Sequence, residues 1–117
     1  MNIEEFRNYC LSKKGVTESF PFDHETLVFK VMGKMFALTN IKGDFSINLK
    51  CNPEKAVGLR ERYPCVKPGC HMNKKHWNTV SIDGSVSKKV LSEWIDQSYN
   101  LIIDGLNKKQ REKISSI

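Results

Sequence analysis

The chain has 117 residues, of which 39% are hydrophobic and 27% are charged, values typical of one compact folded domain. They leave no room for a second domain and exclude a disordered, collagen-like or coiled-coil chain. Nineteen Lys and Arg against thirteen Asp and Glu give a net charge of +6, which favours an acidic macromolecule over a basic one as partner.

The start of the chain and its cysteines indicate the compartment. Residues 1–5 lack the cationic start and apolar stretch of a signal peptide, and no apolar run approaches the ~20 residues of a membrane span. We therefore expect a cytoplasmic protein with no membrane partner. In that compartment we expect reduced, mostly buried thiols at Cys10, Cys51, Cys65 and Cys70, no two of which have CxxC spacing.

The first half of the chain predicts a helix followed by three strands. Asn2, with Glu5 three positions later, caps a helix that runs to Lys14 and stops at Gly15. After a loop through 20–22, alternating apolar runs predict a meander of hairpins. The predicted strands are Leu27–Met32, Lys34–Thr39 and Phe45–Lys50.

The second half predicts a helix, two extended segments and a long helix. Asn52 and Pro53 supply a cap and a first helical residue, and Tyr63-Pro64 ends that helix. The extended segments are 66–72 and 77–82, the last helix runs from Ser87 to Leu106, and residues 107–117 form a basic C-terminal tail.

This order, α-β(3)-α-β(2)-α, predicts a single α+β domain over residues 1–117. We expect two layers: a largely antiparallel five-stranded sheet with helices on one face. Alternation assigns to the helix side Leu27, Phe29, Val31, Phe36, Leu38, Phe45, Ile47, Leu49, Val80 and Ile82. The other face receives Lys30, Thr39, Ser46, Asn48, Lys50, Trp77, Thr79 and Ser81. It is either a ligand-binding surface or an ordinary solvated face.

Positive charge is concentrated in the middle of the chain, where the most polar motif also lies. Residues 31–60 carry five basic and two acidic side chains, and residues 61–90 carry six and two. The stretch 71–78 supplies cations for phosphates, an indole for stacking and amides that can contact base edges. The candidate nucleic-acid contacts are Lys30, Lys34, Lys50, His71, Asn73, Lys74, Lys75, His76, Trp77, Lys88 and Lys89. Alternatively, Lys74 and Lys75 decorate a solvated hairpin and Trp77 covers the rim of a core.

The Pro-Gly-Cys-His-Met-Asn-Lys-Lys-His-Trp-Asn-Thr-Val string at 68–80 resembles the signature of the MmcQ/YjbR family of small, mostly bacterial proteins. Residues 33–38, Phe20-Pro21-Phe22 and Ser98-Tyr99 also match, so the resemblance covers nearly the whole chain. It implies a fold like that of type III secretion chaperones and DNA binding through a paired, wing-like arrangement. Cys70 departs from the pattern, because an aromatic residue is usual there.

Metal and enzyme sites are not expected. Cys65, Cys70, His71 and His76 are potential zinc ligands, but their spacing is poor, and neighbouring residues of an extended segment point to opposite faces. No phosphate loop, HExxH or nucleophile elbow occurs. We therefore expect a non-enzymatic DNA-binding protein without metal or cofactor, with a protein-binding module as the alternative.

Overall fold

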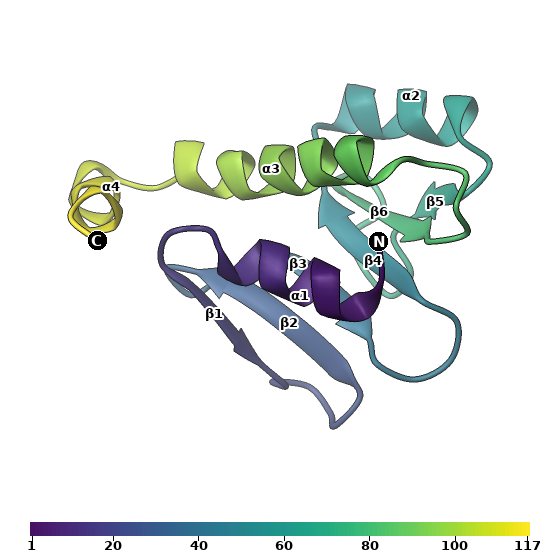
Figure 1. The fold of residues 1–117 in the computed structure, drawn as a ribbon. Coiled ribbons are helices and arrows are strands. Elements are labelled where there is room, and N and C mark those ends of the chain that lie inside the picture. Colours follow the sequence, from purple (N-terminus) through teal and green to yellow (C-terminus); the bar gives the residue numbers. More distant parts are fainter.

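The computed structural model describes residues 1–117 and contains one antiparallel sheet and four helices (Figure 1). The strands are β1 (Val16–Ser19), β2 (Thr26–Val31), β3 (Lys34–Asn40), β4 (Ser46–Lys50), β5 (Val66–Pro68) and β6 (Trp77–Ser81). The helices are α1 (Ile3–Leu11), α2 (Pro53–Arg62), α3 (Lys88–Asp104) and α4 (Lys108–Ser115). None of these helices has the length and apolar character needed to cross a membrane.

The mixed α+β class is confirmed, but the sheet has six strands where five were predicted. The strand order is β1-β2-β3-β4-β6-β5. The additional strand, β1, pairs antiparallel with β2, and Val16 lies opposite Val31. β5 ends at Pro68, so the extended segment predicted for 66–72 is a strand over its first three residues only.

Local sequence explains where the helices begin. Asn2 and Glu5 form the predicted capping box of α1, and the Asn52 side chain accepts a hydrogen bond from the Glu54 N–H ahead of α2. Ser87 caps α3 in the same way, by accepting from the Val90 N–H. These side chains satisfy backbone donors that have no partner within the helix.

The segment predicted as a basic C-terminal tail forms helix α4. Asn107 and Gln110 make a second capping box at its start, and Ile114 is buried in the core. A Cβ built on Gly15 would lie 2.6 Å from the Ile114 side chain, so α4 packs closely on the turn between α1 and β1. Figure 1 shows α4 end-on, beyond the C-terminal end of α3.

The main core lies between the sheet and the helices. Its most deeply buried large side chains include Phe6 from α1, Phe29 from β2, Phe36 from β3 and Ile95 from α3. The Phe6 and Phe29 rings meet edge-to-face with centroids 5.5 Å apart. Figure 1 shows α1 and α3 in front of the sheet, so we call this covered side the helix face.

A β-bulge changes which side chains of β3 face the helices. Phe29 pairs with Ala37 while Lys30 pairs with Met35, so Phe36 is an extra residue in β3. Phe36 and Ala37 both enter the main core, and the alternation after them is reversed. The predicted sides of Leu38 and Thr39 are therefore wrong: Leu38 leaves the helix face, and Thr39 is buried on it, opposite Ile47.

Candidate functional site on the helix-free face

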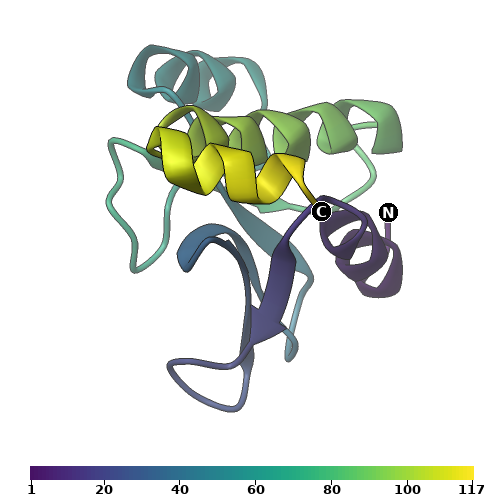
Figure 2. The ribbon, with the colours of Figure 1, turned by 90° about the vertical axis from the view of Figure 1, so that its left-hand side faces the viewer.

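No helix packs on the opposite side of the sheet, which we call the helix-free face. The strand register aligns one residue from each of five neighbouring strands in a row across it. That row is Val28, Leu38, Asn48, Thr79 and Lys67. Figure 2 shows α1 on one side of the sheet, with the β1–β2 connection and the β5–β6 connection on the other. These connections are residues 20–25 and 69–76, named here the β1–β2 loop and the β5–β6 loop.

Trp77 lies on the helix-free face, as the alternation predicted, but it is not a surface aromatic. Its side is fixed by pairing with Lys50, yet the residue is only 7% exposed. It forms a small second core with Val28 and Leu38, against which Met35 and Met72 pack. Because the β5–β6 loop supplies Met72, the loop helps to cover the indole. Of the two interpretations of Trp77, core and stacking surface, the structure supports core.

Gly69 permits this close packing of the loop on Trp77. A Cβ at position 69 would lie 2.8 Å from the Trp77 Cβ and 3.0 Å from its carbonyl oxygen. The Gly69 N–H also donates to that carbonyl oxygen at 2.9 Å. The glycine of the motif is therefore needed for close backbone approach.

Two further motif residues shape the loop from within. The Asn73 carbonyl accepts from the Trp77 N–H at 3.0 Å, and its side chain accepts from the Lys75 N–H at 2.9 Å. The Lys74 ammonium donates to the Gly69 carbonyl at 2.9 Å, so this predicted phosphate contact is already bonded within the loop. Lys75 makes no side-chain hydrogen bond or ion pair and is exposed.

Arg60, which the sequence reasoning missed, connects α2 to the same loop. Its guanidinium donates to Asn78 Oδ1 at 2.7 Å and also to the carbonyl of Lys74. Asn78 in turn donates to the carbonyl of Ala56 in α2 at 3.3 Å. A long polar residue in the last turn of a helix carries no signal for such a contact, because its partners are distant in sequence.

Lysines are distributed unequally around the sheet. Lys30, Lys50 and Lys67 lie on the helix-free face, and none of them forms an ion pair. Glu18 is the only acidic residue in the six strands, and it lies on the helix face, opposite Phe29, where it pairs with Arg7 of α1. The strand positions of the helix-free face therefore carry cations and no carboxylates.

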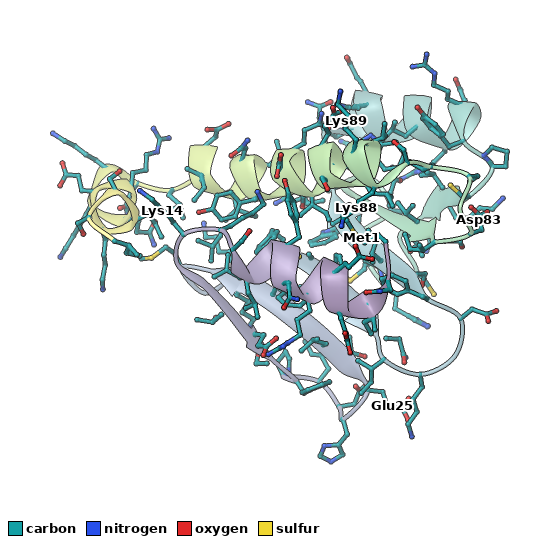
Figure 3. The ribbon with its side chains drawn as sticks, viewed as in Figure 1. Met1, Lys14, Glu25, Asp83, Lys88 and Lys89 are labelled. Atoms are coloured by element: carbon teal, nitrogen blue, oxygen red, sulfur yellow. The ribbon has the colours of Figure 1, made fainter.

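The remaining predicted cations lie elsewhere. Lys34 starts β3 opposite Val31, beside the β2–β3 turn. Lys88 forms an ion pair with Glu5 of α1, and Lys89 is exposed on α3. Figure 3 shows Lys88 near Met1 and Lys89 on the upper side of α3, both on the helix layer. The structure thus gathers Lys30, Lys50 and Lys75 about the helix-free face but separates Lys88 and Lys89 from them.

A groove of about 550 Å³ lies on the helix-free face between the two loops. Leu38, Asn48 and Thr79 line it from the strands, whereas Phe22 and His71 line it from opposite loops. The volume is within the roughly 300–1,000 Å³ range of small-molecule sites. His71 is exposed and has a left-handed backbone, with φ of 58°, a conformation that is uncommon for residues other than glycine.

The four considered metal ligands do not converge. Cys65 is buried in the main core on the helix face, whereas Cys70 is exposed and lines the groove on the other side. No group of three His, Cys, Asp or Glu residues lies close enough to hold a metal ion. Three thiols are buried and Cys70 is exposed, so burial is confirmed for all but one.

The chain is similar to several known proteins over almost its whole length. It is 42% identical to YbdF of Escherichia coli O157:H7, over 95% of this chain and 92% of that protein. It is 33% identical to YjbR of Escherichia coli K12, over 96% of each chain. The names of these relatives specify no ligand or reaction.

Solved structures support the same relationship. The crystal structure of the Deinococcus radiodurans protein DR2400, a DUF419 domain, matches with a TM-score of 0.91 and 40% identity, over 97% of this chain and 88% of that one. A Pseudomonas syringae protein matches with a TM-score of 0.75 and 29% identity, over 86% and 98%. The YjbR family model matches residues 11–101. On sequence and fold together, the chain belongs to the YjbR family.

Proposed function

We propose that the protein is a non-enzymatic DNA-binding protein and that it contacts DNA through the helix-free face. The observation that carries this proposal is the presence of Lys30, Lys50 and Lys67 on a face whose strand positions hold no carboxylate. Lysines without a carboxylate partner can neutralise phosphates and release the counterions bound to DNA. Lys75, on the neighbouring loop, adds a fourth free cation.

The proposed DNA surface contains fewer residues than the sequence predicted. Trp77 is buried, Lys74 is bonded to Gly69, and Lys88 is paired with Glu5. Because these three residues already have partners within the protein, we leave them out of the proposed DNA surface. A small number of phosphate contacts favours weak binding with a clear dependence on salt.

Fluorescence anisotropy with a mixed-sequence duplex tests the proposal. We expect binding at low salt that weakens steadily as salt is added. The double variant Lys30→Ala/Lys67→Ala should weaken binding and reduce the slope of log K against log salt by about one for each lysine that contacts a phosphate. Lys108→Ala/Lys109→Ala removes the same charge from exposed positions of α4 and serves as the matched control.

Two results would contradict the proposal. One is the absence of duplex binding at low salt, where nonspecific affinity is greatest. The other is an equal loss in the two double variants, because that would reflect net charge and not the helix-free face.

A protein-binding module is the alternative, and one observation favours it. Phe20 and Phe22 follow the edge strand β1 and are 45% and 64% exposed. Exposed aromatics beside an unpaired strand edge suit the capture of an extended segment of another protein. The anisotropy measurement separates the two functions, because this alternative predicts no salt-dependent DNA binding.

A further inference from the structure

The groove contains a polar side chain whose hydrogen bonding is incomplete. Asn48 is only 8% exposed and lines the groove from the middle of β4. Its Oδ1 accepts from the Thr79 hydroxyl at 2.5 Å, but no protein atom accepts from its amide nitrogen. That nitrogen is not fully enclosed, so its two hydrogens are available to an acceptor in the groove.

A chain of hydrogen bonds connects the β5–β6 loop to the Asn48 amide. The Cys70 N–H donates to Thr79 Oγ1 at 2.9 Å, and the Thr79 hydroxyl then donates to Asn48 Oδ1. With the amide reversed, the Thr79 hydroxyl hydrogen would lose its acceptor. In this arrangement the Asn48 nitrogen is left without a protein partner in a residue that lines the groove.

The groove lining contains one carboxylate and no lysine or arginine. Asp23 is its only carboxylate, and that group accepts hydrogen bonds from the Glu25 and Thr26 N–H groups at 2.9 and 2.7 Å. These bonds hold the pKa of Asp23 below its usual value, so the carboxylate stays ionised and repels an anionic group from this side of the groove. No lysine or arginine lines the groove, although Lys67 is the cross-strand neighbour of Thr79 at its edge. The lining therefore suits an uncharged ligand portion, with an anionic portion outside.

An aromatic ring stands at the other side of the groove. Phe22 is 64% exposed and belongs to the β1–β2 loop, where the hydrogen bonds of Asp23 fix the adjoining turn. An exposed ring beside hydrogen-bond donors suits a flat molecule that stacks on one surface and accepts at its edge. Nucleobases combine a stacking surface with such acceptors, and in DNA a phosphate lies next to each base.

We propose that this groove binds one unpaired nucleobase. The Asn48 amide donates a hydrogen bond to an acceptor on the edge of the base, and the ring of the base stacks on Phe22. Lys67 then contacts the adjacent phosphate. This inference rests on the proposed function, because we assign the base to a single-stranded stretch of DNA. A paired base cannot enter, because its edge and both surfaces are occupied within the duplex.

Three DNA probes of equal length test the proposal by fluorescence anisotropy: a thymidine strand, a strand of abasic sites and a duplex. We expect the thymidine strand to bind more tightly than the other two. Phe22→Ala should weaken binding of the thymidine strand by roughly five-fold or more while leaving duplex binding unchanged. Phe20→Ala is the matched control, since Phe20 is exposed on the same loop but does not line the groove.

Equal binding of the thymidine and abasic strands, with Phe22→Ala behaving like Phe20→Ala, would overturn the assignment of a DNA base to the groove and leave the lysine surface intact. Failure of every strand to bind would instead contradict the proposed function.

A free nucleotide tests the groove independently of DNA binding. NMR titration with thymidine monophosphate should shift the side-chain amide signals of Asn48 in the wild type, and less so in Phe22→Ala. Unchanged Asn48 signals at saturating nucleotide would overturn the groove proposal. A shift with the nucleotide but no preference for the thymidine strand would show that the base comes from a free nucleotide and would overturn the assignment to DNA.

Discussion

The two faces of the sheet differ in how completely their polar groups are used. On the helix side, two ion pairs join α1 to neighbouring elements: Arg7 with Glu18 and Lys88 with Glu5. On the helix-free face, Lys30, Lys50 and Lys67 lack carboxylate partners, and the Asn48 amide nitrogen lacks an acceptor. Groups that the fold does not use are the ones available to a ligand, so the comparison directs the functional assignment to the helix-free face.

The same comparison changes the interpretation of the 68–80 motif. Its most distinctive residues build the small core and the loop that covers it, as with Trp77, Gly69 and Lys74. Lys75 is the motif residue that we place on the proposed DNA surface, and His71 lines the groove. A dense motif can therefore mark a structural element that supports a site more than the site itself.

The largest expected effect is on stability, from the small core of the helix-free face. Trp77→Ala should lower the free energy of unfolding by roughly 3–5 kcal/mol, because it removes a large buried ring and leaves a cavity. Chemical denaturation beside the wild type measures this. Phe22→Ala is the control and should change stability by less than about 0.5 kcal/mol, since Phe22 is exposed. A small loss for Trp77→Ala would mean that the indole is not a core residue.

A Gly69→Ala change tests the close approach of the loop to β6. The added methyl group would lie 2.8 Å from the Trp77 Cβ, and we expect a loss of roughly 1–3 kcal/mol from overpacking. Gly58 in α2 has no atom within 4 Å of an added Cβ, so Gly58→Ala should stabilise the protein by roughly 0.5–1 kcal/mol. Equal thermal shifts for the two variants would contradict this account of the loop.

Alkaline pH should weaken the helix side. Burial raises the pKa of Cys10 to about 12, and the hydrogen bond to Asp96 raises the pKa of Tyr9 to about 12. Both groups hold their protons more tightly when folded, so their contribution is complete below pH 9 and is lost between about pH 9 and 12. In that window stability should fall steadily as pH rises, because the unfolded chain gives up these protons while the folded protein still holds them.

Denaturation at several alkaline pH values, with Cys10→Ala for comparison, checks this expectation. The free energy of unfolding of the variant should fall less steeply with pH, because one of the two titrating groups is absent. A profile identical to that of the wild type would remove Cys10 from the explanation.

The smallest expected effect separates two adjacent lysines. Lys74→Ala should cost about 1 kcal/mol of stability, since it leaves the Gly69 carbonyl without its ammonium partner. Lys75→Ala should leave stability almost unchanged but make the salt dependence of DNA binding shallower. Thermal unfolding and anisotropy on both variants test the pair, and the opposite pattern would reverse the roles assigned to them.

Local sequence signals predicted most of the fold because they act locally. The caps at Asn2, Asn52 and Ser87 each satisfy a backbone donor a few residues away. The same kind of signal was present at Asn107 and Gln110, where a helix forms in place of the expected tail. β1 was missed because its residues, Val16 to Ser19, include one apolar side chain and give no alternating pattern.

Tertiary effects account for what could not be predicted. The bulge at Phe36 reverses the sides of Leu38 and Thr39, and nothing in the neighbouring residues specifies it. The contacts of Arg60 and the groove beside Asn48 arise where distant segments meet. The face that carries the candidate site was therefore predictable from alternation. The loop that covers Trp77 and the groove beside Asn48 were not.

NMR titration of the labelled protein with a short single-stranded DNA tests the assignment to the helix-free face most directly. We predict backbone and side-chain shifts at Lys30, Asn48, Lys67 and Lys75, with little change along α1 and α3. Shifts concentrated instead at Lys88 and Lys89 on α3, with the helix-free face unaffected, would contradict it.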